Sequence, residues 1–396
     1  MVTRLAKSRL DDALADTPVV VVQGPRQCGK STLVQSLAHG PYVTLDDSLS
    51  RSAASLTPAS FLTAHGPRLV LDEVQREPGL FREIKKLVDR DRSPGRFLLT
   101  GSANILLLPK LSDSLAGRME VVPLWPLAQA EIEGANVAFA DWAFGDAWPQ
   151  SKPCDNLQEL ILKGGFPEPF SRSMPTRRRA WFDSYVKALI ERDVRDMADI
   201  DGLAHLPRLL SALAHRPYEV LNVSALARET GVPHTTLTRY IGLLEGVFLL
   251  NAIPAWTATQ ARVAKTERLA FVDSGVWAHL RGPGPVSVEA IEMFLAMELV
   301  KQKGWAETDY EVMHFRSIRQ HSVPIVLRRS DGKVVGVTVI YRSEPEPGDF
   351  KALEFFAEVV GKEFHRGFVL HSGSRCGPVT EHLGAAPVNG LWAPAL

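Results

Sequence analysis

Residues 19–34 read VVVVQGPRQCGKSTLV, and this stretch decides the fold class of the chain. Four consecutive β-branched residues predict a strand that is buried on both of its faces. The residues that follow fit the pattern G-x-x-x-x-G-K-[S/T] without a mismatch, and we expect a helix to begin at Lys30. A strand, this loop and a helix in that order predict a P-loop, because the glycines let successive backbone N–H groups point at phosphate oxygens.

The predicted loop assigns a set of nucleotide-binding residues. These are Gly24, Pro25, Arg26, Gln27, Cys28, Gly29, Lys30, Ser31 and Thr32. We expect Lys30 to reach the β- and γ-phosphates and the Ser31 hydroxyl to coordinate Mg²⁺, so that ATP and Mg²⁺ are the expected cofactors. Cys28 is interpreted as a small side chain that the loop tolerates, with a reactive thiol as the alternative.

The residues around the loop predict the domain that carries it. Further apolar runs predict four more strands, at residues 42–47, 68–73, 96–102 and 120–124. The segments between the runs have helical periodicity. Strands that alternate with helices predict a parallel sheet covered on both faces, so we expect an α/β P-loop NTPase domain at residues 1–135.

Two adjacent carboxylates end the predicted strand at residues 68–73. Asp72 is expected to hold Mg²⁺ through water, as a Walker-B aspartate does. Glu73 follows it and is expected to act as the general base that polarises the attacking water. The alternative is a strand that ends at a solvated acidic turn, and the presence of the P-loop makes this alternative less favourable.

Further catalytic candidates follow in the same domain. The stretch LLTGSAN, residues 98–104, ends a predicted strand in small polar residues. Ser102 or Asn104 is therefore expected to orient the attacking water, with a plain strand-terminating turn as the alternative. Arg118 precedes the last predicted strand, and we interpret it as an arginine that completes the phosphate site of a neighbouring subunit. A surface arginine is an equally favoured interpretation.

Composition limits the class of protein. A chain of 396 residues predicts two or three domains, and its formal net charge of zero gives no chain-wide positive field for nucleic acid. Cys28, Cys154 and Cys376 form neither a metal-ligand spacing nor a disulfide framework, which indicates a reducing compartment. No stretch approaches the roughly 20 apolar residues of a membrane helix. We therefore expect a cytoplasmic protein without a membrane segment.

The rest of the chain predicts two further domains. Residues 136–155 are rich in Trp, Ala and Pro and are interpreted as a linker or an insertion. Residues 156–282 are expected to form a helical or winged-helix domain, with a helix–turn–helix at residues 219–250. After a Gly/Pro hinge at residues 281–287, alternating apolar runs predict a second α/β domain at residues 283–396.

Two clusters in the helical region are candidate DNA contacts. The first lies on the early turns of the second helix of the helix–turn–helix and comprises His234, Thr235, Thr236 and Arg239. A helix of this polarity fits a major groove, but helix–turn–helix units also pack against protein. The second cluster is Arg177, Arg178 and Arg179. These arginines are expected to contact phosphates, with a solvated start of a helix as the alternative.

The motifs together resemble one prokaryotic family. GPRQCGKSTL, LDEVQ, LLTGSAN and SLAGR occur here in the order and spacing of AAA+-type P-loop ATPases with a DUF4143 region, the AAA_14/DUF4143 family. The stretches LILKGGFPEPF, RRAWFDSYVKALIERDV and ERLAFVDSGVWAHLRG extend the resemblance to residue 282. The resemblance implies an oligomeric, nucleotide-dependent switch or motor, with the DUF4143 region at residues 156–282. It also makes Arg192, in the recurring stretch ERDV with Asp193, a second candidate for the trans-acting arginine.

The same resemblance implies a restriction-endonuclease fold for the last domain. Members of the family carry acidic residues and a lysine on two strands, where this chain has Pro324, Thr338 and Ile340. Only Glu298, on the preceding helix, is retained. A magnesium site that cleaves phosphodiesters cannot be assembled from these side chains. We therefore expect a degenerate nuclease domain that serves as a scaffold or a binding surface.

These observations predict an ATP hydrolase that depends on Mg²⁺, forms a homo-oligomer and acts on DNA. The alternative is a nucleotide-gated switch with slow hydrolysis and a protein partner, for example in stress, toxin–antitoxin or defence systems. Nuclease activity ranks below both because of Pro324 and Ile340. A small-molecule kinase ranks low as well, since no acceptor-binding signature follows the loop.

Overall fold

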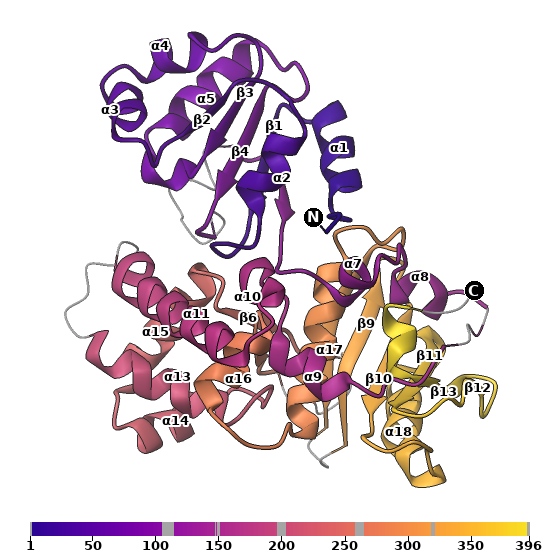
Figure 1. Cartoon of the computed structure of the whole chain (residues 1–396). Coiled ribbons are helices and arrows are strands. Elements are labelled where there is room, and N and C mark those ends of the chain that lie inside the picture. The colour runs from indigo at the N-terminus through magenta and orange to yellow at the C-terminus, as the bar shows by residue number, and fades with distance from the viewer. Residues whose placement is uncertain are drawn as a thin grey trace.

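A computed structural model of the chain describes residues 2–104, 115–146, 148, 151–195, 203–257, 265–317 and 321–393. The described residues form a P-loop unit (residues 2–124), a helical unit (residues 156–282) and a C-terminal unit (residues 288–393). In Figure 1 the P-loop unit lies above the other two, which lie side by side beneath it. Asn104, which we considered as a sensor, is the last residue described before the gap that ends at residue 115.

The P-loop unit contains the predicted parallel sheet. Its strands are β1 (Val19–Gln23), β2 (Tyr42–Thr44), β3 (Leu69–Asp72), β4 (Phe97–Gly101) and β5 (Met119–Pro123). Their order across the sheet is β2-β3-β4-β1-β5, and every neighbouring pair is parallel. Since β4 lies between β1 and β3, the P-loop, the acidic pair and the predicted sensor all follow strands that end at the same edge. The prediction of an α/β P-loop NTPase fold is confirmed.

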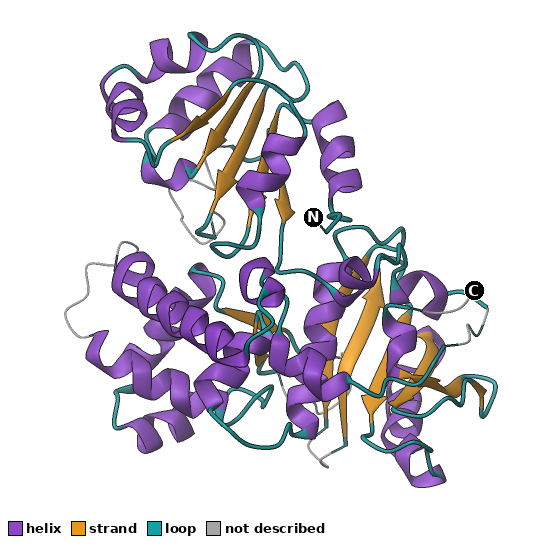
Figure 2. Ribbon diagram, in the orientation of Figure 1, coloured by secondary structure: helices purple, strands orange, loops and turns teal. Residues whose placement is uncertain are grey.

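Helices cover both faces of this sheet, as Figure 2 shows. They are α1 (Lys7–Asp16), α2 (Lys30–Ser36), α3 (Ser48–Leu56), α4 (Pro58–Thr63) and α5 (Leu80–Arg90). Val20 and Val22 belong to the hydrophobic cluster that includes Leu10 of α1. Val19 and Val21 belong to the opposite cluster, with Phe81 and Ile84 of α5. Alternate side chains of a strand point to opposite faces, and this explains why four successive valines are all buried.

The helical unit contains the helices predicted from its periodicity. They are α9 (Leu157–Lys163), α10 (Pro167–Ser171), α11 (Pro175–Ala188), α13 (Leu206–Ala214), α14 (Val223–Thr230), α15 (His234–Gly246) and α16 (Ser274–Arg281). Gly231, with φ of +71°, ends α14, and α15 begins three residues later, as the helix–turn–helix prediction requires. An antiparallel hairpin of β6 (Leu250–Ile253) and β7 (Arg268–Phe271) follows α15. The winged-helix classification of this unit stays a prediction.

The C-terminal unit is a further α/β domain. It contains α17 (Val288–Gln302), β8 (Tyr310–Arg316), β9 (Ser322–Arg329), β10 (Val334–Val339), α18 (Lys351–Val360), β11 (Phe364–His371), β12 (Gly377–Pro378) and β13 (Leu383–Pro387). The sheet order is β12-β13-β11-β10-β9-β8. Pairing is antiparallel from β8 to β10 and parallel from β10 through β11 to β13.

Residues 136–155, which we expected to be a linker or an insertion, contribute to the core of the C-terminal unit. They include α8 (Phe139–Ala143), which follows α7 (Gln129–Glu133). The rings of Phe139 and Trp142 lie edge-on to Phe368 of β11, at centroid distances of 5.5 and 5.2 Å. The backbone N–H of Phe139 also donates to Gln302 Oε1 at 2.7 Å. Aromatic burial therefore fixes a segment whose irregular composition suggested a loose connection.

Candidate functional site

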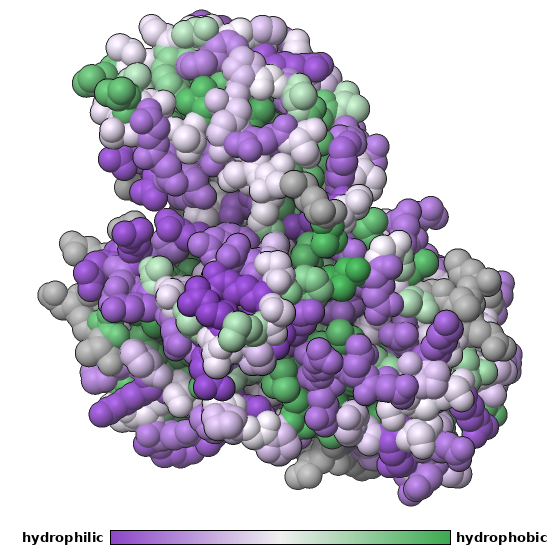
Figure 3. Space-filling model, in the orientation of Figure 1, coloured by the Kyte–Doolittle hydropathy of each residue, from purple (hydrophilic) through white to green (hydrophobic). Residues whose placement is uncertain are grey.

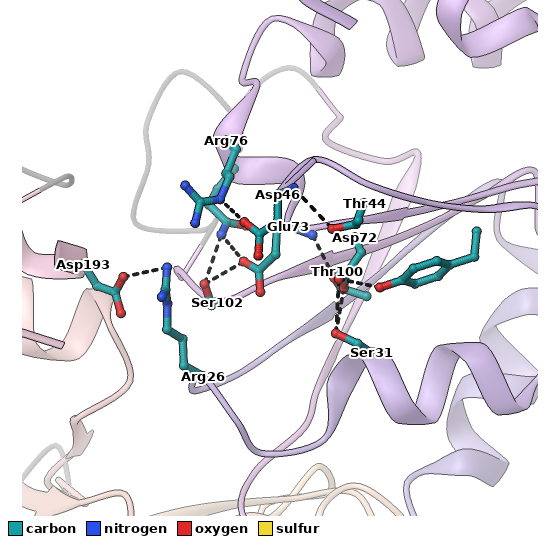
Figure 4. A network of polar contacts seen from close by, with 12 residues as sticks. Arg26, Ser31, Thr44, Asp46, Asp72, Glu73, Arg76, Thr100, Ser102 and Asp193 are labelled. Atoms are coloured by element: carbon teal, nitrogen blue, oxygen red, sulfur yellow. Dashed lines mark hydrogen bonds and ion pairs between the residues drawn. The ribbon is translucent and has the colours of Figure 1, made fainter. Parts of the chain in front are cut away.

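The centre of the candidate site is Asp72, the last residue of β3. Its side chain is 5% exposed and accepts hydrogen bonds from Ser31 Oγ at 3.0 and 3.2 Å and from Tyr42 Oη at 2.6 Å. Thr100 of β4 donates to it as well, as Figure 4 shows. Burial, together with the hydrogen bond to Asp72, raises the pKa of Tyr42 to about 12, which keeps its hydroxyl a donor. Ser31 and Asp72, the two predicted metal residues, are thus in direct contact.

The loop backbone has the shape that phosphate binding requires. Gly29 has φ of +102°, and a Cβ on Gly24 would lie 1.9 Å from the carbonyl oxygen of Leu124. Both positions therefore require glycine. Lys30 is 4% exposed, and its Nζ donates to the carbonyl oxygens of Gly24 and Pro25, each at 2.9 Å. The buried ammonium thus lies within the loop itself, where it can exchange carbonyl oxygens for phosphate oxygens.

Glu73 has a strained backbone and a fixed carboxylate. Its φ of +58° is in the left-handed region, which is uncommon for a residue with a side chain and is concentrated at functional sites. Ser102 Oγ donates to Glu73 Oε2 at 2.8 Å. Gln75 Nε2 donates to the same oxygen and also to Ser102 Oγ, at 3.0 Å. The predicted base and the predicted sensor are therefore neighbours, and Gln75, which we did not predict, bridges them.

The surroundings of Glu73 favour its ionised form. Burial raises the pKa of Glu73, but nearby Lys30, the hydrogen bonds from Gln75 and Ser102 and the charge of Arg26 lower it. The net result is a pKa below the ordinary value of a glutamate. The carboxylate is therefore ionised at neutral pH and can accept a proton from water.

Arg26 connects the loop to the helical unit. Its Nη2 lies 2.9 Å from Asp193 Oδ1, on the π-helical turn Leu189–Val194 that extends α11. Figure 4 shows the guanidinium of Arg26 between Asp193 on one side and Ser102 and Glu73 on the other. Arg26 Nε is buried and has no hydrogen-bond partner among the described residues. An unpaired donor inside a phosphate-binding loop fits an anionic ligand.

Arg4 also supports the loop, and its role was not predicted from the sequence. Its Nη1 donates to the carbonyl oxygen of Cys28 at 2.8 Å and its Nη2 to that of Trp125 at 2.7 Å. Its Nε lies 3.0 Å from Glu131 Oε1, on α7. Arg4 precedes the first helix and lies twenty residues before the start of the motif at Gly24, so no local pattern identifies it. The buried thiol of Cys28 donates to the carbonyl oxygen of Leu124.

The two candidate trans-acting arginines are not part of this cluster. Arg118 precedes β5 and therefore lies at the amino edge of the parallel sheet, opposite the P-loop edge of its own chain. Its Nε lies 2.5 Å from Asp89 Oδ1. Arg192 is exposed on the π-helical turn. Asn104 lies between units, since its backbone N–H donates to the carbonyl oxygen of Gly246 at 2.8 Å.

The candidate DNA contacts lie on the surface of the helical unit. On α15, His234, Thr235 and Arg239 are exposed and Thr236 is half-buried. On α11, Arg177 and Arg179 are exposed, and Arg178 and Arg179 line a groove of about 820 Å³ together with Lys163 and Arg281. Figure 3 shows a strongly hydrophilic surface over α10 and α11.

The burial and contacts of Glu298 indicate that it stabilises the fold. It is 0% exposed, its Oε1 lies 2.7 Å from Lys301 Nζ, and its Oε2 accepts the backbone N–H of Gln129 at 2.7 Å. Pro324 lies on β9 and Thr338 on β10, and Ile340 follows that strand. Within the described ranges, no group of three or more His, Cys, Asp and Glu side chains could hold a metal ion. Nor does this part of the chain contain a helix with the length and apolarity to cross a membrane.

Comparisons with known proteins agree with this division of the chain. Residues 16–133 match the family model described as AAA domain, residues 154–287 match a domain of unknown function, DUF8612, and residues 289–390 match another, DUF4143. The DUF4143 model therefore covers the C-terminal unit and not residues 156–282, where the resemblance placed it. The helical and C-terminal units contact each other through α16 and α17. The short sequence stretches that carry the resemblance do not show which of these two units is the DUF4143 domain.

Two curated relatives and two solved structures show further similarity. The uncharacterized proteins Mb2031c of Mycobacterium bovis and Rv2008c of Mycobacterium tuberculosis are each 32% identical to the chain over 282 residues. That alignment covers 70% of the chain, and the chain spans 59% of the length of these relatives.

The Walker-type ATPase PABY2304 of Pyrococcus abyssi is 14% identical, with coverage of 70% of this chain and 95% of that chain and a TM-score of 0.44. The STAND protein PH0952 of Pyrococcus horikoshii, which has a tetratricopeptide repeat sensor, is 13% identical, with coverage of 76% and 46% and a TM-score of 0.23. TM-scores of this size do not establish a shared fold. The sequence motifs, the parallel sheet and the matched family models support a P-loop ATPase-type AAA domain that is combined in this chain with a DUF4143 domain.

Proposed function

We propose that the chain binds Mg²⁺–ATP at its P-loop and hydrolyses the bond between the β- and γ-phosphates. The observation that carries this proposal is the cluster at the carboxyl edge of the sheet. Ser31 contacts Asp72 at 3.0 Å, and Ser102 contacts Glu73 at 2.8 Å on the neighbouring strand ends. Lys30 lies within the loop beside them. These side chains supply a metal site, a base and a phosphate-binding cation in one place.

Each residue has a separate part in the proposed reaction. Lys30 and Arg26 bind phosphate oxygens, and the loop N–H groups orient them. Ser31 and Asp72 would hold Mg²⁺, which neutralises charge on the β- and γ-phosphates when it is bound. Glu73 accepts a proton from water as the water oxygen bonds to the γ-phosphorus. The bond from that phosphorus to the bridging oxygen breaks, and ADP leaves. Ser102 and Gln75 hold the carboxylate of Glu73 in position.

We propose that DNA is the molecule on which this ATPase acts. The exposed polar start of α15 and the groove lined by Arg178 and Arg179 support this part of the proposal, since hydroxyls and arginines are common phosphate and base contacts. Assembly into a homo-oligomer is proposed because Arg118 lies too far along the sheet to reach its own P-loop. It can complete a phosphate site only in another copy.

A protein partner is the second candidate for the molecule on which this ATPase acts. Leu49 and Leu56 lie seven residues apart on α3 and are 79% and 82% exposed. Seven residues are two helical turns, so both side chains lie on one face. Figure 3 shows hydrophobic atoms on the surface over α3. An exposed apolar pair of this kind favours a protein contact over a nucleic-acid contact.

Steady-state ATP hydrolysis by Glu73→Gln tests the proposed function. The variant keeps the shape of the side chain but removes the base, so we expect turnover to fall about 10²–10⁴-fold with nucleotide affinity retained. Glu354→Gln is the matched control, because Glu354 is exposed on α18, far from the loop. Unchanged turnover in Glu73→Gln contradicts the assigned base. Added duplex or single-stranded DNA is expected to raise the turnover of the native chain, and a flat response favours the protein partner.

A further inference from the structure

The contact between Arg26 and Asp193 joins two units of the chain at the phosphate loop. Arg26 is the third residue of the loop, and its partner lies more than 160 residues later, on the extension of α11. The side chains are 28% and 12% exposed, so water screens this ion pair less than a surface pair. The ion pair therefore connects the conformation of the loop to the position of the helical unit.

Asp193 lies on an extension of α11, a helix that packs into the helical unit. It lies on a π-helical turn, a conformation that is rare and often marks functional sites. The preceding helix is anchored by aromatic packing, with the rings of Trp181 and Tyr185 stacked at a centroid distance of 4.9 Å and Phe166 at 4.9 Å from Tyr185. Asp193 is thus connected through α11 to the packed interior of the helical unit.

A bound triphosphate would act on this ion pair in two ways. Phosphate oxygens are strong partners for a guanidinium, and the Nε of Arg26 is a buried donor without a partner among the described residues. The phosphates also add negative charge close to the carboxylate of Asp193, and like charges repel. Both effects weaken the pair between Arg26 and Asp193.

We propose that Asp193 and the phosphates of a bound nucleotide compete for Arg26, so that nucleotide binding loosens the helical unit from the P-loop unit. Asp193 is a positioning residue in this scheme, because it acts on the nucleotide through Arg26. The inference rests on the proposed nucleotide binding and adds the route by which binding reaches the rest of the chain.

Nucleotide affinity in a double-mutant cycle tests the competition. The probe is a fluorescent, non-hydrolysable ATP analogue with Mg²⁺, titrated into the full chain. Asp193→Ala and Asp193→Asn are expected to bind it about fivefold more tightly, because a competitor for Arg26 is removed. In an Arg26→Ala background, Asp193→Ala is expected to tighten binding much less, because only the direct repulsion between the carboxylate and the phosphates is then removed. Glu191→Ala, an exposed acid on the same turn, is the control for a general change of charge.

If Asp193 had a purely structural role, its loss would weaken the binding of the ATP analogue or leave it unchanged. Asp193→Asn keeps the side-chain volume and provides a folded variant if Asp193→Ala destabilises the turn. Equal or weaker binding by both variants, with native unfolding temperatures, overturns the competition.

The distance between the two units gives an independent readout. Leu56 on α3 and Met174 beside α11 are 82% and 60% exposed, and both accept a spin label after substitution by cysteine. Cys28 and Cys154 are buried, and Cys376→Ser removes the more accessible native thiol. We expect the ATP analogue to shift the distance distribution in this background and not after Arg26→Ala.

The two proposals fail in different ways. If the analogue binds, and Lys30→Ala abolishes binding, but neither affinity nor distance depends on Asp193 or Arg26, the competition is wrong and the P-loop function stands. If the native chain binds no analogue, both proposals are wrong.

Discussion

Glu298 provides the sharpest test of the C-terminal unit, because its contacts assign it a structural role. It lies on α17 with 0% exposure and binds Lys301 Nζ and the backbone N–H of Gln129, each at 2.7 Å. Lys301 also donates to the carbonyl oxygen of Leu127 at 3.2 Å. This cluster attaches the segment around Leu127 and Gln129, which follows the P-loop unit, to α17 of the C-terminal unit. We predict that Glu298→Ala destabilises the fold strongly.

The magnitude follows from what the substitution leaves behind. Removal of one partner of a buried ion pair costs about 3–5 kcal/mol, because the ammonium of Lys301 stays buried without its carboxylate partner. The unpaired N–H of Gln129 contributes to the same loss. For a unit of about 100 residues, one kcal/mol shifts the unfolding temperature by about 4–8 °C, so we expect a decrease of at least about 12 °C. The double variant Glu298→Leu with Lys301→Met is expected to recover most of it, because an apolar pair of similar volume replaces both charges.

Thermal unfolding followed by circular dichroism, with urea titration beside it, measures these effects. Glu354→Ala serves as the control, since Glu354 is exposed on α18. A loss below about 1 kcal/mol in Glu298→Ala, or no recovery in the double variant, refutes the reasoning. A metal-dependent nuclease activity that disappears with Glu298 would also contradict the structural assignment.

Two further predictions concern pH and assembly. Burial, together with the positive charge of Arg268, lowers the pKa of His314 to about 4, although the hydrogen bond from its Nε2–H to the Thr266 carbonyl at 3.0 Å opposes this shift. The unfolded chain takes up this proton below about pH 6.5, so the stability that neutral His314 contributes, about 3 kcal/mol, is lost as pH falls from about 6.5 to 4. Urea unfolding at several pH values checks this, and an equally steep decline in His314→Gln would contradict it. Arg118→Ala is expected to lower ATP turnover by about 10³–10⁵-fold with an unchanged sedimentation coefficient, and an assembled variant with native turnover removes Arg118 from the trans-acting role.

Much of the P-loop unit could be predicted from local pattern. Continuous apolar runs identify β1, β3 and β4 because a parallel strand is buried on both faces, whichever tertiary contacts it makes. Parallel strands end at a common edge, and this places Ser31, Asp72, Glu73 and Ser102 together without knowledge of any long-range contact. The candidate site within one unit was therefore accessible to sequence reasoning.

Contacts between units were not accessible in this way. Arg4 contacts Glu131 of α7, and Asp193 of the helical unit contacts Arg26 of the loop, and both contacts depend on how the units pack. The packing of residues 136–155 could not be predicted for the same reason, since the burial of Trp142 against Phe368 is decided by a strand more than 200 residues later. The composition of a segment shows how apolar its side chains are, but it does not show which other part of the chain packs against them.

Calorimetric titration of ATP and Mg²⁺ into the purified chain, with Lys30→Ala as the comparison, tests the central claim most directly. We predict one nucleotide per chain with a dissociation constant between about 1 µM and about 1 mM. Loss of the Lys30 ammonium, which lies 2.9 Å from two loop carbonyl oxygens, is expected to weaken binding at least about tenfold. A well-folded native chain that takes up neither ATP nor GTP at millimolar concentration would contradict the account.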